Sequence, residues 1–173
     1  SAAFLEILKR HSSAVEQFSI DEAFLDMSEH FSDRRREEAA IRTCAAAIQT
    51  EIWETLGFTV NVGISENKLL AKMASDFEKP DKIHTLWPEE LSAKFYPLPI
   101  RALFGVGGQS AEKLLRFGIH TIGEAAATPC EVLQRILGPS AGKAVYQSAR
   151  GINHSAVRRE RPQAKSHSVE RTT

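Results

Sequence analysis

Two short runs near the start of the chain alternate apolar and polar positions and predict a pair of β-strands. In the run 15–20, Phe18 and Ile20 lie on one face, and in the run 23–27 the apolar face includes Leu25. The two residues between the runs therefore lie at a strand junction, where side chains at the edge of a sheet are exposed.

Helical periods flank these strands. Residues 4–8 form a short amphipathic pattern, and a longer helix is expected from about Arg34 to Leu56, ended by Gly57. The apolar stripe of the longer helix consists of Ile41, Ala45, Ile48 and Ile52.

The following segment predicts a strand, a helix and a strand. Residues 58–64 alternate strictly, Ser65 is placed to cap a helix over residues 67–77, and residues 82–87 form a further short strand. Strands with helices on one face indicate an α+β fold with an antiparallel or mixed sheet.

The pattern changes at Pro88, after which we expect short helices and no strand. Capping-box spacing occurs at Thr121–Glu124 and at Thr128–Glu131, the second with Pro129 at the first helical position. We predict an α+β domain over residues 1–87, a small all-helical domain over 88–157 and a linker over 158–173. The linker is polar and basic, with Arg158, Arg159, Arg161, Lys165 and Arg171.

Composition fits a protein with a packed core. The 173 residues are 42% hydrophobic and 25% charged. No apolar run approaches the length of a membrane span, and the first residues do not form a basic-then-apolar leader. Cys44 and Cys130 lie far apart in predicted helices, which favours small buried apolar residues over a disulfide or metal site. We expect a reducing cytoplasm and no membrane partner.

The net charge is zero, but it is unevenly distributed. Residues 1–87 contain 10 lysines and arginines against 15 acidic residues, a net −5, and residues 88–173 contain 12 against 7, a net +5. An acidic half beside a basic half is typical of a metal-dependent phosphoryl-transfer site joined to a DNA-binding module.

Asp21 and Glu22 are adjacent carboxylates at the predicted strand junction. Because like charges repel, their pairing favours a bound divalent cation, and Mg²⁺ takes one or two carboxylates while water and substrate phosphates complete its shell. The alternative is an ordinary turn dipeptide, since turns favour Asp.

The segment from Leu103 to Leu114 predicts a helix-hairpin-helix motif. Gly105 and Gly107 allow a tight turn with positive φ, and the helix that follows begins with free N–H groups that can bind a DNA phosphate. The candidate DNA-binding residues are Gly105, Val106, Gly107, Gly108 and Lys113, with Arg116 adding charge. The alternative is a plain glycine-rich turn between helices. For a weaker repeat of the pattern at residues 136–144, we favour a structural brace.

Lys68 and Lys72 share one face of the helix predicted over residues 67–77, and Lys79 follows its end beside Pro80. A lysine just beyond a helix end can reach a triphosphate as a point charge. We take Lys79 as the nucleotide-binding candidate and interpret Lys68 and Lys72 as a solvated face.

These strings together resemble the Y-family DNA polymerases, which copy past damaged bases, and most closely their bacterial polymerase IV branch. The specific part is Ser19-Ile20-Asp21-Glu22-Ala23-Phe24-Leu25-Asp26, which resembles the family signature SIDEAFLD. The segments at residues 63–80 and 103–114 follow in the family's order, so the resemblance covers nearly the whole chain. It implies a partial palm followed by a helix-hairpin-helix thumb.

The resemblance also implies a mechanism. Asp21 and Glu22 would be metal-binding carboxylates for two Mg²⁺ ions, with Asp21 bridging both and Glu22 holding the one at the primer oxygen. Lys79 would contact the triphosphate of the incoming dNTP. Residues 105–108 would hold a backbone phosphate of the primer–template DNA.

The family's first catalytic Asp and its fingers lie upstream of this signature, and its little finger and sliding-clamp peptide lie downstream of the thumb. We therefore expect a fragment that does not polymerise, with a weakly occupied metal site. Two alternatives remain: an inactive paralogue that acts as a non-enzymatic DNA-binding module, and an unrelated helix-hairpin-helix repair protein.

Overall fold

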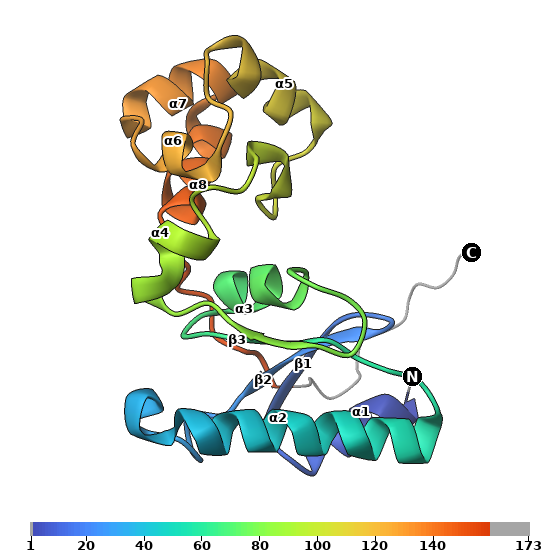
Figure 1. The fold of residues 1–173 in the computed structure, drawn as a ribbon. Helices are drawn as coiled ribbons and strands as arrows, with labels where there is room; N and C mark the ends of the chain where they lie inside the picture. The colour runs from blue at the N-terminus through green and yellow to red at the C-terminus, as the bar shows by residue number, and fades with distance from the viewer. Residues whose placement is uncertain (1, 160–173) are drawn as a thin grey trace, which may run out of the picture. The chain divides into compact units, whose positions relative to one another are not determined.

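The computed structural model describes residues 2–159, which divide into two compact units (Figure 1). One unit consists of residues 2–58 together with 157–159, and the other of residues 59–156. Within the described part of the chain, no helix is long and apolar enough to cross a membrane. The mixture of small sheets and helices confirms the predicted α+β class.

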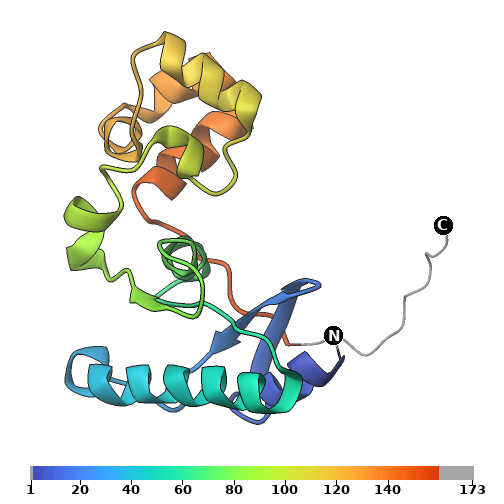
Figure 2. The same cartoon turned by 45° about the vertical axis from the view of Figure 1, so that its right-hand side comes forward.

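The first unit contains a β-hairpin and two helices. Its elements are α1 (Ala2–Lys9), β1 (Ala14–Ser19), β2 (Glu22–Asp26) and α2 (Arg34–Leu56). β1 and β2 pair antiparallel with Val15 opposite Leu25, and α1 packs against both β1 and α2 (Figure 2). The fully or nearly buried apolar side chains are Phe4, Ile7, Leu8, Ala14, Val15, Ala45, Ile48 and Ile52.

The long helix α2 has the bounds that the sequence predicts. The carboxylate of Asp33 accepts hydrogen bonds from the amides of Arg35 and Arg36 at its start, and Gly57 ends it with φ of 78°. Three of the four members of the predicted stripe, Ala45, Ile48 and Ile52, are buried, and Ile41 is half-buried.

The second unit joins a small parallel sheet to a set of short helices. Its elements are β3 (Val62–Ile64), α3 (Lys68–Ser75), β4 (Ile83–Thr85), η1 (Pro88–Glu90), α4 (Leu91–Lys94), η2 (Ile100–Ala102), α5 (Gly108–Arg116), α6 (Ile122–Ala126), α7 (Cys130–Leu137) and α8 (Pro139–Ala149). α3 packs against β3 and β4, and α5 to α8 gather at the other end of the unit (Figures 1 and 2). One hydrophobic cluster extends from Leu70 of α3 through Phe95 to Leu133 and Ala149.

The strands form two separate two-stranded sheets, and the strands predicted over 58–64 and 82–87 are shorter than expected. Only residues 62–64 of the run 58–64 are a strand. Phe58 follows the left-handed Gly57, and its ring packs at a tilt against that of Phe4, with centroids 6.1 Å apart, so it belongs to the packing of the first unit instead.

Two predicted caps are wrong and one is confirmed. The Ser65 hydroxyl donates to the Leu86 carbonyl, so Asn67 caps α3 in its place. Thr121 and Glu124 do form a capping box on α6. Thr128, in contrast, donates its hydroxyl to the Glu124 carbonyl at 2.7 Å and leaves α7 without a side-chain cap.

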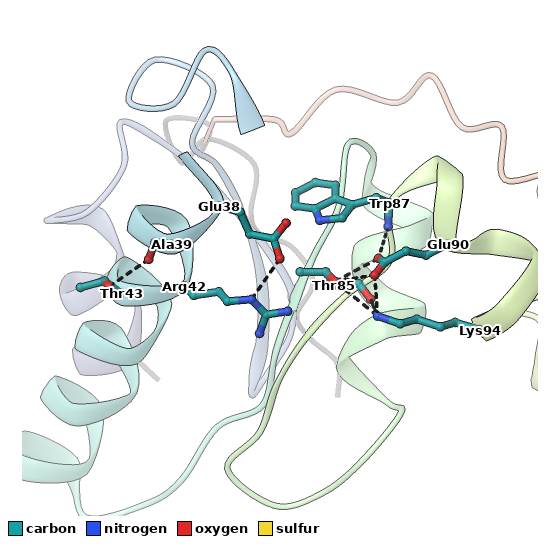
Figure 3. A network of polar contacts seen from close by, with 8 residues as sticks. All are labelled: Glu38, Ala39, Arg42, Thr43, Thr85, Trp87, Glu90 and Lys94. Atoms are coloured by element: carbon teal, nitrogen blue, oxygen red, sulfur yellow. Dashed lines mark hydrogen bonds and ion pairs between the residues drawn. The ribbon is translucent and has the colours of Figure 1, made fainter. Parts of the chain in front are cut away.

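A hydrogen-bond network occupies the place where the sequence predicts a domain boundary (Figure 3). Glu90 accepts from the Trp87 amide at 2.8 Å, from the Thr85 hydroxyl at 3.0 Å and from Lys94 at 2.8 Å. Lys94 also donates to the Thr85 carbonyl at 3.2 Å, and Thr85 is 1% exposed. The boundary at 87/88 stays a prediction, whereas the compact units separate at 58/59.

Cys44 and Cys130 are free thiols, as expected, but both are half-buried rather than buried. Burial raises the pKa of the Cys44 thiol. Of the predicted basic linker, Arg161, Lys165 and Arg171 lie outside the described residues.

Candidate functional site

The two carboxylates lie at the tip of the β1–β2 hairpin. Asp21 is in the turn and exposed, and Glu22 is the first residue of β2 and half-buried. The Ser19 hydroxyl lies 3.2 Å from Oδ1 of Asp21 and 3.2 Å from Oε2 of Glu22. Because one hydroxyl proton serves one carboxylate at a time, Ser19 orients the pair without neutralising its charge.

The register of the β1–β2 hairpin is irregular beside these two carboxylates. Gln17 faces Ala23 and Ser19 faces Glu22, with a bulge between them. A bulge strengthens the local twist and re-aims the side chains beside it. Behind the tip, Phe18 packs edge-to-face on Phe24 with ring centroids 5.6 Å apart.

The base of the hairpin is fixed by Ser12. Its hydroxyl donates to the Asp26 carbonyl at 2.6 Å, and Ser12 itself is 4% exposed. Hydrogen bonds from the hydroxyl and amide of Ser28 hold the pKa of Asp26 below its usual value. Asp26 is thus engaged at the base, and the pair at the tip is the candidate for metal binding.

The donor set at the tip fits a hard cation that keeps part of its water shell. Over residues 2–159, no three His, Cys, Asp or Glu side chains gather as a metal-binding cluster. Mg²⁺ commonly takes one or two protein carboxylates and completes six-fold coordination with water and phosphate oxygens. Asp21 and Glu22 match that part of a site but do not form a closed cage.

Lys79 lies in the second unit, beyond the end of α3. Its ammonium is 3.3 Å from Oδ1 of Asp76, and the Lys72 ammonium is 3.3 Å from Oδ2 of the same carboxylate. The Lys79 side chain is 61% exposed, but that of Lys72 is only 17% exposed. Lys72 is therefore not part of a solvated face. The ammonium of Lys68, on the same helix, donates to the Ala156 carbonyl at 3.4 Å.

The glycine-rich hairpin is open at the start of α5. Gly105 has φ of 95°, as predicted, but Gly107 has φ of −82° and serves as the N-cap. No side chain caps α5, and the first amide bonded back to the cap is that of Ala111. The preceding N–H groups have no acceptor within the helix.

Glycine at 107 and 108 is not required by packing inside the chain. A Cβ added at either position meets no atom within 4 Å. Neither residue has a positive φ. Small residues there leave room for a partner to approach the backbone, with Lys113 and Arg116 exposed on the same helix.

The weaker glycine motif has the predicted structural role. Gly138, with φ of 99°, separates α7 from α8. A Cβ on Gly142 would lie 2.4 Å from the backbone of Gln134, so α8 packs directly on α7. This pair of helices supports the α5 hairpin as a brace.

The sequence candidates fall into two groups. Asp21 and Glu22 are adjacent in the first unit, and Lys79, Lys113 and residues 105–108 belong to the second. Sequence reasoning missed Asn67, Asp76 and Glu90. Only the spacing of Asp76 from Lys72 and Lys79 was a usable signal, as an i, i+4 and i, i+3 pattern.

Comparison with known proteins places each part of the chain. Residues 1–76 match the model of the impB/mucB/samB family, and residues 101–153 match the model described as DNA polymerase-iota, thumb domain. DNA polymerase IV of Clostridium acetobutylicum is 42% identical over 172 residues, which is 99% of this chain and 42% of that protein. DNA polymerase IV of Moorella thermoacetica is 41% identical over 157 residues, 91% of this chain and 38% of that protein.

Solved structures agree with these relatives. The crystal structure of DinB from Sulfolobus solfataricus superimposes with a TM-score of 0.77 at 28% identity, covering 90% of this chain and 45% of that one. The insertion ternary complex of Dbh DNA polymerase gives 0.78 at 28% identity, covering 90% and 44%. The chain thus spans less than half the length of the relatives it matches.

Proposed function

Because this chain belongs to the Y-family of DNA polymerases, we propose that the protein containing it performs template-directed nucleotidyl transfer past damaged bases. The primer 3′-oxygen attacks the α-phosphate of a dNTP, and pyrophosphate leaves. The observation that carries the proposal is the carboxylate pair at the hairpin tip, where the Ser19 hydroxyl lies 3.2 Å from an oxygen of Asp21 and 3.2 Å from an oxygen of Glu22.

Asp21 and Glu22 would hold two Mg²⁺ ions. When bound, such ions activate the attacking oxygen and offset charge on the leaving phosphates. Ser19 keeps the two carboxylates oriented together, and the contact of Phe18 with Phe24 supports the hairpin behind them.

The second unit supplies the binding groups. Lys79 offsets charge on the triphosphate as a point charge. The N–H groups at the start of α5 bind a backbone phosphate of the primer–template duplex, which positions the DNA without reading its sequence. The absence of side chains at Gly107 and Gly108 lets that phosphate approach.

The natural partners are primer–template DNA, dNTPs and, through a segment outside this chain, a sliding clamp. The cytoplasm is the compartment in which a bacterial enzyme of this kind meets its substrates. Since this chain spans 42% of the Clostridium relative, we propose that it does not polymerise alone.

The test uses the full-length protein and primer extension. We expect Asp21→Asn to abolish templated incorporation while the Kd for primer–template DNA changes less than about twofold. Glu29→Gln is the matched control, because Glu29 is an exposed carboxylate that lies away from the tip and contacts Ser13 and Arg159. It should leave incorporation unchanged.

Three results would each contradict a part of the proposal. Undiminished incorporation by the Asp21→Asn variant would remove the carboxylate pair from the chemistry. Duplex binding without any incorporation by the wild-type protein would favour the non-enzymatic DNA-binding module. Incorporation by the 173-residue chain alone would overturn its assignment as inactive.

A further inference from the structure

Asn67 makes two hydrogen bonds that join distant parts of the second unit. Its Oδ1 accepts from the Leu70 amide at 2.9 Å and so caps α3. Its Nδ2 donates to the carbonyl of Gly151 at 2.9 Å, just after the end of α8. One side chain therefore fixes both the start of α3 and the exit from the helical part of the unit.

The contact at Gly151 is tight as well as hydrogen-bonded. Gly151 has φ of 76°, and a Cβ there would lie 3.1 Å from Cδ1 of Leu91 and 3.5 Å from Cδ1 of Leu70. The backbone at this position lies in a niche between α3 and α4. The hydrophobic cluster of the unit is continuous across it, with Leu70 and Ala149 both buried.

Each side of this junction leads to a candidate binding group. On one side, the eight-residue helix α3 includes Lys72 and leads to Lys79, and both lysines contact Asp76. On the other side, α8 packs directly on the backbone of α7 through Gly142, and α7 contacts α5. The Asn67–Gly151 hydrogen bond is one polar link between these two sides, at the start of α3.

We propose that Asn67 is a positioning residue that holds the Lys79 segment in place relative to the DNA-binding hairpin. This inference rests on the proposed function, because it takes Lys79 as the triphosphate ligand and α5 as the phosphate-binding helix. If Lys79 and its neighbours are already held in place before the nucleotide binds, they lose less conformational freedom on binding than a mobile segment would. Loss of the link should therefore weaken nucleotide binding.

Two substitutions separate this role from helix capping. Asn67→Asp and Asn67→Ser both keep a good N-cap for α3. Neither can donate to the Gly151 carbonyl as Asn67 does. The aspartate has no donor, and the serine side chain is too short to place its hydroxyl where Nδ2 of Asn67 lies. A residue that only caps α3 would tolerate both.

The measurement is steady-state single-nucleotide incorporation by the full-length protein. We expect the KM for dNTP to rise about three- to tenfold in both variants, the size expected for one lost hydrogen bond. The kcat per active molecule and the Kd for duplex DNA should stay within about twofold. Asp33→Asn, which keeps the cap of α2 and makes no such link, is the matched control and should leave the KM unchanged.

A double-mutant cycle shows whether Asn67 acts through Lys79. Lys79→Ala alone should raise the KM, and Asn67→Asp added to it should raise the KM no further. An unchanged KM in both Asn67 variants, or full additivity with Lys79→Ala, would overturn the positioning role. If the wild-type protein binds DNA but incorporates no nucleotide, the proposed function fails first and the inference fails with it.

Discussion

Gly63 and Ala71 lie closer together than any side chain on Gly63 would allow. A Cβ built on Gly63 would stand 1.9 Å from the Ala71 carbonyl oxygen and 2.5 Å from the Ser75 amide nitrogen. The strand β3 therefore rests directly on the backbone of α3. The helix that leads to Lys79 owes its place in the second unit to this missing side chain.

Gly63→Ala should strongly destabilise the second unit. The methyl group meets backbone atoms that cannot rotate away, so β3 and α3 must separate. We expect a loss of about 3 kcal/mol or more in the free energy of unfolding, at the upper end for overpacked cores. Urea denaturation of the 173-residue chain measures it. Gly108→Ala is the control, since its Cβ meets nothing within 4 Å, and a similar loss there would disprove the steric argument.

Gly108→Ala should weaken DNA binding without weakening the fold. The new methyl group stands where the proposed phosphate approaches the amides of α5, and it leaves the chain's own packing intact. We expect the Kd for a primer–template duplex to rise about tenfold, or about 1.4 kcal/mol, in fluorescence anisotropy at fixed salt. For comparison, Lys113→Ala should lower the slope of log K against log salt by about one. Unchanged affinity in the Gly108 variant would exclude the α5 amides from the interface.

The carboxylate pair should bind divalent cations weakly in the 173-residue chain. Mn²⁺, which shares the oxygen ligands of Mg²⁺, should broaden the amide NMR signals of residues 19–23 at millimolar concentration. Asp21→Asn and Glu22→Gln should each abolish the effect, because one carboxylate alone leaves too few ligands. Asp76→Asn, which alters the lysine-bound carboxylate in the other unit, should not. Broadening that persists in both tip variants would place the cation elsewhere.

The Glu90 network should contribute to stability at neutral pH and lose that contribution in acid. Burial alone would raise the pKa of Glu90, but hydrogen bonds from Lys94, the Trp87 amide and Thr85 outweigh it and hold the pKa below its usual value. A lowered pKa means that the stabilisation is complete above the unfolded-state pKa, about 4.3, and disappears as the pH falls through the folded-state pKa.

Glu90→Gln tests this dependence, since it keeps the size of the side chain and removes the charge. At pH 7 it should cost about 0.5 to 1 kcal/mol, as for a partly exposed ion pair. As the pH falls below about 4.3 and then through the folded-state pKa, the variant and the wild type should converge in thermal denaturation. Curves that stay parallel across that range would show that the carboxylate charge contributes nothing.

Helix bounds with strong end signals were predictable from sequence. Asp33 and Gly57 mark the two ends of α2, and both act as the residue types suggest. The caps at Ser65 and Thr128 were not predictable in the same way, because a hydroxyl can also donate to a carbonyl. Ser65 donates to Leu86, which is distant in sequence, and tertiary structure decides between the two uses.

The candidate site divides along similar lines. The position of Asp21 and Glu22 at a strand junction follows from local alternation, and the structure has it there. The Asn67–Gly151 bond spans 84 positions, and nothing in the local sequence of either residue indicates it. Local sequence predicts a solvated Lys72, but its side chain is 17% exposed and contacts the Asp76 carboxylate.

The boundary between Phe58 and Thr59 determines which part of this protein can be exchanged as one piece. Residues 59–156 are one uninterrupted stretch with its own hydrophobic cluster, whereas the first unit is assembled from two separate stretches of chain. In sequence, the second unit therefore lies between the two stretches that form the first unit. A chimera with a relative, joined at 58/59 and 156/157, would therefore exchange Lys79 and the proposed DNA-binding helix α5 together and leave the hairpin of Asp21 and Glu22 unchanged.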